Sequence, residues 1–197
     1  EEGYPSEWTD LEVGAYDVYS VGAAPDFEDS DQLFALVTNA SPYTAVMENL
    51  NGAIGDWSEY GDELKDSNGA SFEVDDVVFG ASRFGFPDDF DDGEELFIGV
   101  VGKGAVAGSV HRVTDSNSYN LGAEDADINL DVMSLDLVGS TGSTSILAGV
   151  CSAVKDKVIV SMDDGDSWDD PSKEPSGNAC AWVVVGPDFA DSDTAWA

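Results

Sequence analysis

Positively charged residues are scarce in this chain. Only 7 Lys and Arg stand against 41 Asp and Glu among 197 residues, so the formal net charge is −34 at pH 7. Such a surface repels nucleic acids and anionic membranes, and we therefore expect neither a nucleic-acid partner nor membrane insertion. The excess of acidic residues favours a protein that stays soluble in salt, binds divalent cations or lies outside the cell. We interpret most of these acidic side chains as solvated surface.

Long apolar runs, histidine and cysteine are also rare. No stretch reaches the roughly 18 apolar residues of a membrane-spanning helix. The one histidine, His111, has no serine or cysteine motif near it, and we expect it at a strand edge beside Arg112. Two cysteines, Cys151 and Cys180, are too few to define a disulfide framework. In an exported protein they would pair, whereas in a cytosolic protein they would be two small buried hydrophobic residues.

The chain does contain enough apolar material for a core, because 42% of its residues are hydrophobic and 10% are aromatic. No sustained 3.6-residue apolar period occurs, so helix content should be minimal. Short alternating or continuous apolar segments predict strands instead. The predicted strands are Tyr16–Ala24, Gln32–Thr38, Tyr43–Glu48, Val74–Ser82, Leu96–Val101, Ser109–Val113, Val132–Val138, Ile146–Val150, Val158–Val160 and Ala181–Val185.

These segments recur in one order along the chain. Aromatic residues close successive cycles, with separations of 49, 62 and 49 residues, at Trp8, Trp57, Tyr119 and Trp168. Proline gives a second marker, since Pro25 and Pro87 are 62 residues apart. The next 100 residues, from Pro87 to Pro187, leave room for two cycles. The two markers indicate the same tandem repeat, about the length of one four-stranded sheet.

The stretch Ser161–Trp168, SMDDGDSW, predicts a hairpin turn. Asp163 can accept backbone N–H bonds, Gly165 can adopt a positive φ, and Trp168 returns to pack on the hairpin. The stretch resembles the Asp-box, S-x-D-x-G-x-x-W, which occurs once per blade in sialidase-like and sortilin-like β-propellers. Ser167 replaces the usual threonine before the aromatic residue. The resemblance implies that Ser161, Asp163, Gly165 and Trp168 have structural roles.

The repeat and the resemblance together imply an all-β fold, a partial β-propeller of about three four-stranded antiparallel blades with partial blades at both ends. The expected segments are the end of a preceding blade (1–14), three blades (15–70, 71–131 and 132–178, the last with the intact Asp-box) and the start of another (179–197).

Three blades and a fraction cannot close a ring, because propellers close with about four to eight. We therefore favour a segment of a larger propeller, with completion by another copy or another chain as the alternative. The chain starts at Glu1, without a methionine or a signal peptide, which fits either processing or a longer parent chain.

The acidic corners between predicted strands are the candidate cation sites. Ca²⁺ takes six to eight oxygen ligands in flexible geometry, and several carboxylates fall within each short loop. The alternative interpretation is that these are turns in which aspartate caps the backbone and keeps sheet edges soluble. The candidate ligands are Asp26, Asp29, Asp31, Asp88, Asp91, Asp188, Asp191 and Asp193. Separately, Asn39-Ala40-Ser41 is a glycosylation sequon if the protein is secreted.

Enzymatic functions find little support. A sialidase needs three arginines around the substrate carboxylate, and this chain has only Arg83 and Arg112. A glycosidase needs only two carboxylates, but with 41 acids some pair would always satisfy the spacing. The glycine-rich stretch Gly102–Gly108 lacks the phosphate-loop pattern and is expected to connect two strands.

The expected function is therefore a non-catalytic structural or assembly module, extracellular or at the cell surface, of a surface-layer or filament kind. Its expected partners are other copies of itself or other envelope proteins, with Ca²⁺ assisting their association. The alternative is a glycan-binding or glycoside-hydrolase-type propeller whose active-site residues lie outside this segment.

Overall fold

The computed structural model describes residues 9–38, 43–73, 76–78, 80–90, 95–104, 106–123, 130–151, 157–173, 175–176, 180–186, 189–192 and 194–197. Within these ranges the predicted all-β class is confirmed: the sheets are antiparallel, and helix is confined to single turns. The helical turns are α1 (Phe27–Ser30), η1 (Leu121–Ala123) and α2 (Phe189–Ser192). None of the helices in these ranges has the length and apolar character needed to cross a bilayer.

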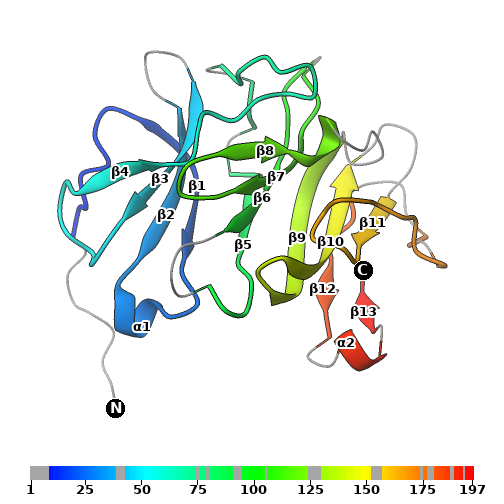
Figure 1. The fold of residues 1–197 in the computed structure, drawn as a ribbon. Coiled ribbons are helices and arrows are strands. Elements are labelled where there is room, and N and C mark those ends of the chain that lie inside the picture. Colours follow the sequence, from blue (N-terminus) through cyan, green and yellow to red (C-terminus); the bar gives the residue numbers. More distant parts are fainter. Residues whose placement is uncertain are drawn as a thin grey trace.

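Two sheets have four strands each, and in both the strands are neighbours in chain order (Figure 1). The first sheet contains β1 (Asp17–Ala23), β2 (Leu33–Thr38), β3 (Thr44–Asn49) and β4 (Trp57–Tyr60). The second contains β5 (Arg83–Gly85), β6 (Leu96–Val100), β7 (Ser109–Val113) and β8 (Ser118–Asn120). Both sheets are therefore antiparallel meanders.

The third and fourth sheets are smaller. The third contains β9 (Asp131–Ser140), β10 (Ser143–Cys151) and β11 (Lys157–Ser161), and the fourth contains β12 (Val184–Val185) and β13 (Ala195–Trp196). An isolated bridge between Val160 and Asp169 brings a returning segment alongside β11. The four sheets fall within 15–70, 71–131, 132–178 and 179–197, except that β9 starts one residue early, at Asp131.

The sheets stack on one another in chain order, and Figure 1 shows them following each other across the molecule. Their first strands lie side by side, since β1 contacts β5, β5 contacts β9, and β9 contacts β12. Side-chain alternation supplies apolar groups to both faces of a middle strand. In β2, Phe34 and Leu36 pack against the second sheet, whereas Ala35 and Val37 pack on the opposite face. Similar apolar layers lie between the second and third and between the third and fourth sheets.

The first and last sheets repeat one unit, 162 residues apart. Gly22 pairs with Phe34 in the first sheet, and Val184 pairs with Trp196 in the last. A one-turn helix joins the two strands in each case, α1 or α2. The backbone hydrogen bonds that flank these helices also correspond, at 3.1 and 2.8 Å, from Ala24 N–H to the Gln32 carbonyl and from Gly186 N–H to the Thr194 carbonyl.

The aromatic markers lie in the last strand or segment of their units, but not in one register and not in one environment. By strand pairing, the counterpart of Trp57 in the second sheet is Ser118, which precedes Tyr119. Trp57 opens β4, Tyr119 lies in β8, and Trp168 directly precedes the Asp169 bridge to β11. Trp168 is buried, whereas Tyr119 is 43% exposed. Trp8 lies outside the described residues.

Most predicted strands are confirmed within a few residues, but the one at Val74–Ser82 is wrong, because the second sheet begins with β5 at Arg83. In the described part of that segment, Val77 is buried and makes only an isolated bridge with Gly102. Val77 and Ala81 are thus buried without belonging to a strand. The predicted strand-edge position of His111 is also wrong: it lies fully buried in β7, between β6 and β8, edge-on to the Phe72 ring.

Candidate functional site

A group of interacting charges lies between the second and third sheets. Arg112 on β7 pairs with Asp164, in the turn after β11, at 3.0 Å, and lies 3.9 Å from Asp166. Its guanidinium also lies 5.5 Å from the centre of the Tyr119 ring, close enough for a cation–π contact. One of the chain's few cations is thus held by two carboxylates and an aromatic ring.

Asp164 links this charge pair to the backbone of the third sheet. Its N–H donates to the Thr144 carbonyl at 2.9 Å, and its carboxylate accepts the Thr144 N–H at 3.4 Å. Asp164 adopts a left-handed conformation, φ 64°, which aspartate tolerates better than most residues. The residue is buried, so its pairing with Arg112 offsets much of the cost of removing the charge from water.

Glu95, just before β6, is the second buried carboxyl of the group. Its Oε1 accepts the Gly142 N–H at 2.9 Å, at the tip of the β9–β10 hairpin. Burial raises the pKa of Glu95, and the neighbouring Asp164 carboxylate adds to the effect. Glu95 and Asp164 therefore form a carboxyl pair in which Arg112 stabilises the charge of Asp164.

The acidic corner before β6 also binds the β9–β10 hairpin. Asp88 accepts the Gly139 N–H at 3.1 Å, and Asp89 accepts the N–H and hydroxyl of Thr141 at 2.8 and 3.1 Å. The Thr141 N–H lowers the pKa of Asp89. These contacts favour the backbone-capping interpretation of this corner over a cation site.

The Ser161–Trp168 turn is held by its own side chains. The Ser161 hydroxyl donates to Asp163 at 2.9 Å and accepts the Gly165 N–H at 2.8 Å, and Gly165 has a φ of 87°. Asp163 also accepts the hydroxyl and N–H of Ser167 at 2.6 and 2.9 Å, and the hydroxyl bond is the main reason that the pKa of Asp163 is lowered. The indole N–H of Trp168 donates to the Gly165 carbonyl at 3.1 Å. Each of the four motif residues thus shapes this turn.

The other candidate cation ligands are not brought together in the part of the chain that the structure describes. Asp26 accepts the Ser30 hydroxyl at 3.1 Å, and Asp31 ends α1 in a left-handed conformation. No three acidic, histidine or cysteine side chains among the described residues are placed to hold a metal ion. Asp91, Asp188, Asp193 and Asn39 lie outside those residues, as does the side chain of Asp191.

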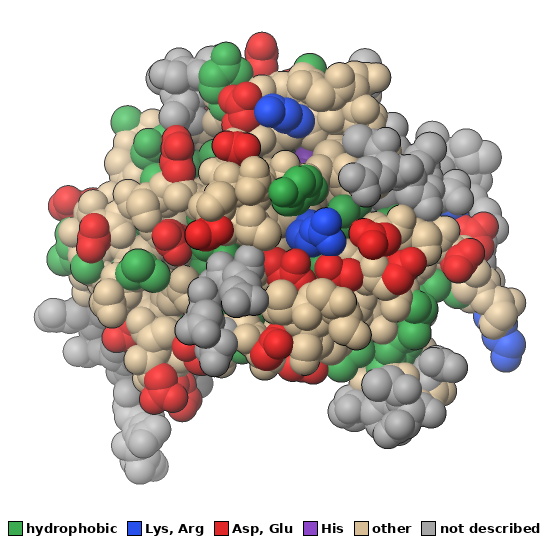
Figure 2. Space-filling model, viewed as in Figure 1, with side chains coloured by type: hydrophobic (Ala, Val, Ile, Leu, Met, Phe, Trp, Pro, Cys, Tyr) green, Lys and Arg blue, Asp and Glu red, His purple; other side chains and the backbone are tan. Residues whose placement is uncertain are grey.

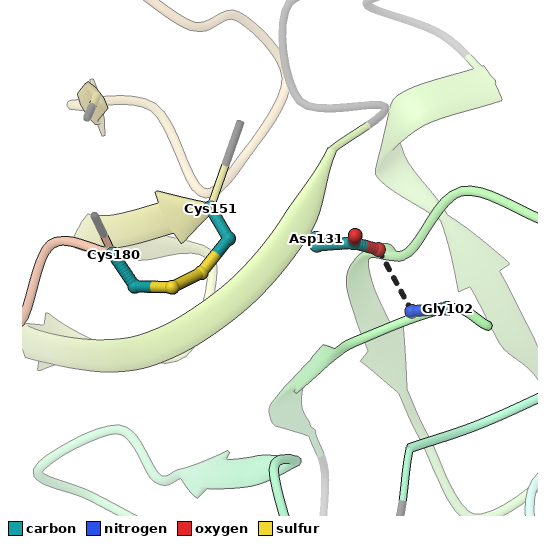
Figure 3. The surroundings of a disulfide bond; sticks show 4 residues. All are labelled: Gly102, Asp131, Cys151 and Cys180. Atoms are coloured by element: carbon teal, nitrogen blue, oxygen red, sulfur yellow. Dashed lines mark hydrogen bonds between the residues drawn. A yellow bond between two sulfur atoms is a disulfide. The ribbon is translucent and has the colours of Figure 1, made fainter. Parts of the chain in front are cut away.

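Cys151 and Cys180 form a disulfide (Figure 3), with 4.4 Å between their Cα atoms. The bond joins the end of β10 to the segment leading into the last sheet. Near it, Asp131 accepts the N–H groups of Gly102 and Gly108 at 2.8 and 3.0 Å. Those glycine N–H groups are therefore used inside the protein and do not face an open phosphate site.

Both arginines make contacts within the protein. Arg83 donates to the carbonyls of Gly80 and Ser82 at 3.0 and 2.8 Å and lies 5.3 Å from the Trp182 ring. Figure 2 shows acidic side chains spread over the visible face, with basic groups at only a few points. The Glu95–Asp164 pair has the contrasting environments that acid–base catalysis uses. Both carboxylates are buried and bonded to backbone N–H groups, however, so the arrangement binds two sheets together.

Sequence reasoning missed this network, because Glu95, Arg112 and Asp164 are far apart in the chain and belong to no spaced motif. A glutamate directly before the buried strand β6 was the one available signal. In comparisons with known proteins, no family model matches the chain, and no curated protein sequence matches it.

We predict that Glu95→Gln changes how stability depends on pH. The folded-state pKa of Glu95 is raised above its ordinary 4.5. The contribution of Glu95 to the stability of the folded protein is therefore fully present below pH 4.5 and is lost as the pH rises through the folded-state pKa. Glutamine keeps the acceptor for Gly142 but cannot ionise. In urea unfolding at pH 4 and pH 8, the stability of Glu95→Gln relative to wild type should therefore rise with pH. Exposed Glu59→Gln is the control, and an equal difference at both pH values for Glu95→Gln would contradict the prediction.

His111 gives a pH dependence of the opposite direction. Burial lowers its pKa from 6.5 to about 3, and neither ring nitrogen has a hydrogen-bond partner among the described residues. Below pH 6.5 His111 binds a proton in the unfolded chain but not in the folded chain, so stability falls by about 1.4 kcal/mol for each unit by which the pH is lowered. From pH 6.5 to 4.5, His111→Leu should therefore gain about 2 to 3 kcal/mol on wild type in urea unfolding. A difference that does not change with pH would show that the buried imidazole is protonated.

Proposed function

We propose that the chain is a segment of an Asp-box β-propeller and acts as a non-catalytic assembly module outside the cell or on its surface. The repeat carries this proposal: meandering sheets stack in chain order with their first strands adjacent. The last sheet also reproduces the register of the first. Such an arrangement is what tandem blades would produce. The Ser161–Trp168 turn supports the same family, because each of its motif residues holds the hairpin.

Two features support an extracellular, non-catalytic role. The Cys151–Cys180 disulfide fits an oxidising compartment. Both arginines and the Glu95–Asp164 pair are used in internal contacts, which leaves them unsuited to gripping a substrate. An acidic coat of net charge −34 makes close approach of two copies costly, and divalent cations between the facing surfaces would lower that cost.

Calcium between facing copies should therefore stabilise the assembled protein beyond the effect of ionic strength. Weak extracellular sites bind Ca²⁺ at about 0.1 to 1 mM. A concentration about ten times the dissociation constant adds about 1.4 kcal/mol, which raises the Tm of a chain of this size by about 3 to 5 °C. We predict this shift in thermal unfolding with CaCl₂, its reversal by chelator, and a smaller shift with MgCl₂. NaCl of equal ionic strength is the control. Identical melting curves in NaCl and CaCl₂ would show that Ca²⁺ has no specific stabilising effect, which would contradict the role proposed for calcium.

A further inference from the structure

The last sheet presents an exposed apolar face. Val184 and Trp196 are each 57% exposed. Val184 and Trp196 are paired across β12 and β13, so their side chains share one side of the sheet. Trp182 lies before β12, and the Arg83 guanidinium of the second sheet lies over its ring. On the opposite side, Val183 and Ala195 pack against the third sheet. We call the exposed pair, Val184 and Trp196, the outer face.

The repeat shows what covers the corresponding face of the first sheet. Trp196 corresponds to Phe34 there, which is fully buried. Two of the rings around Phe34 come from the second sheet: Phe84 on β5 and Phe86 just after it, at 6.4 and 5.5 Å between ring centroids. The Tyr60 ring of the first sheet and the Phe90 ring lie at 5.2 and 5.5 Å. The outer face therefore has the register of a surface that another sheet covers elsewhere in this molecule.

The covering residues also have counterparts in this chain. Gly85 pairs with Phe97, and Phe84 with Ile98, as Gly22 pairs with Phe34 and Val21 with Ala35. Phe84, Phe86 and Leu96 therefore correspond to Val21, Ala23 and Leu33. Val21 is 69% exposed, Ala23 is exposed and Leu33 is half-buried. We call Val21, Ala23 and Leu33 the receiving face.

The sizes of the two faces are complementary. Gly22 leaves room for Phe84, because a Cβ on Gly22 would lie 2.9 Å from that of Phe84. On the outer face the larger Val184 replaces the glycine, and on the receiving face the smaller Val21 replaces the phenylalanine. In the same way, Trp196 is larger than Phe34, and Ala23 is smaller than Phe86. A larger side chain on the outer face is therefore matched by a smaller side chain on the receiving face, relative to the contact between the first and second sheets.

The two faces belong to the first and last sheets, which lie at opposite ends of the row of sheets in Figure 1. One molecule in this arrangement cannot bring them together. We propose that the outer face of one copy binds the receiving face of a second copy, which continues the stack of sheets from molecule to molecule. This contact is heterologous, so it builds rings or open chains of copies rather than symmetric dimers. The inference rests on the proposed assembly role and names its partner.

The experiment uses the full chain and analytical ultracentrifugation in about 1 M NaCl, where the Debye length of about 3 Å suppresses repulsion between the acidic surfaces. Wild type should associate in a concentration-dependent way. Trp196→Asp and Val21→Asp, each blocking one face, should both sediment as monomers. An equimolar mixture of the two variants still has one intact face of each kind, so it should form dimers and nothing larger. Ile54→Asp, at a residue 59% exposed and on neither face, is the matched control and should associate like wild type.

Each outcome of this experiment either supports or contradicts the proposed interface. Circular dichroism and melting curves should show that the variants are folded, since both altered side chains are exposed. Association that survives both variants would overturn this interface while leaving the proposed assembly role standing. A wild type that stays monomeric in NaCl and in CaCl₂ would overturn the interface and the assembly role together. Dimers of either variant alone would show a symmetric contact, which also contradicts the proposal.

Discussion

The stacking of one sheet on the next is the constraint on which the structure depends. Every residue of β6, Leu96–Val100, is buried, because the strand faces the first sheet with Leu96 and Ile98 and the third sheet with Phe97. A strand with two apolar faces cannot be stable alone in water, and β6 gains its core from the sheets on both of its sides. The sheets approach closely at this point: a Cβ on Gly85 would lie 2.6 Å from the Leu137 side chain on β9, which would have to move.

The large negative charge is compatible with this stack because carboxylates are placed where backbone N–H groups need acceptors. Asp88, Asp89 and Glu95 accept N–H groups at the tip of the β9–β10 hairpin, and Asp131 accepts an N–H group of the glycine-rich loop after β6. Only the 7 basic residues are available for ion pairing, so backbone amides take over part of that role. The acidic corners therefore join adjacent sheets as well as keeping the surface soluble.

Much of the fold could be predicted from the sequence, because alternation reports directly on which side chains are buried. The strand at Tyr16–Ala24 was predicted from alternation, those at Gln32–Thr38 and Ser109–Val113 from short apolar segments, and the Ser161–Trp168 turn from local chemistry. Val74–Ser82 was misassigned because an apolar segment can fill a core without pairing as a strand. The burial of His111 and the Glu95–Arg112–Asp164 network depend on tertiary contacts, which leave no periodic trace. The complementary outer and receiving faces became visible only once strand pairing fixed the register of the repeat.

A double-mutant cycle between Gly85 and Leu137 tests most directly whether β5 and β9 are stacked as described. In urea unfolding, Gly85→Ala should cost about 1 to 3 kcal/mol in the wild-type background, because the added methyl group meets the Leu137 side chain. In a Leu137→Ala background the methyl group has room, and most of that cost should disappear. An equal cost in both backgrounds would mean that the two residues are not in contact, and the stacked arrangement of the sheets would be wrong.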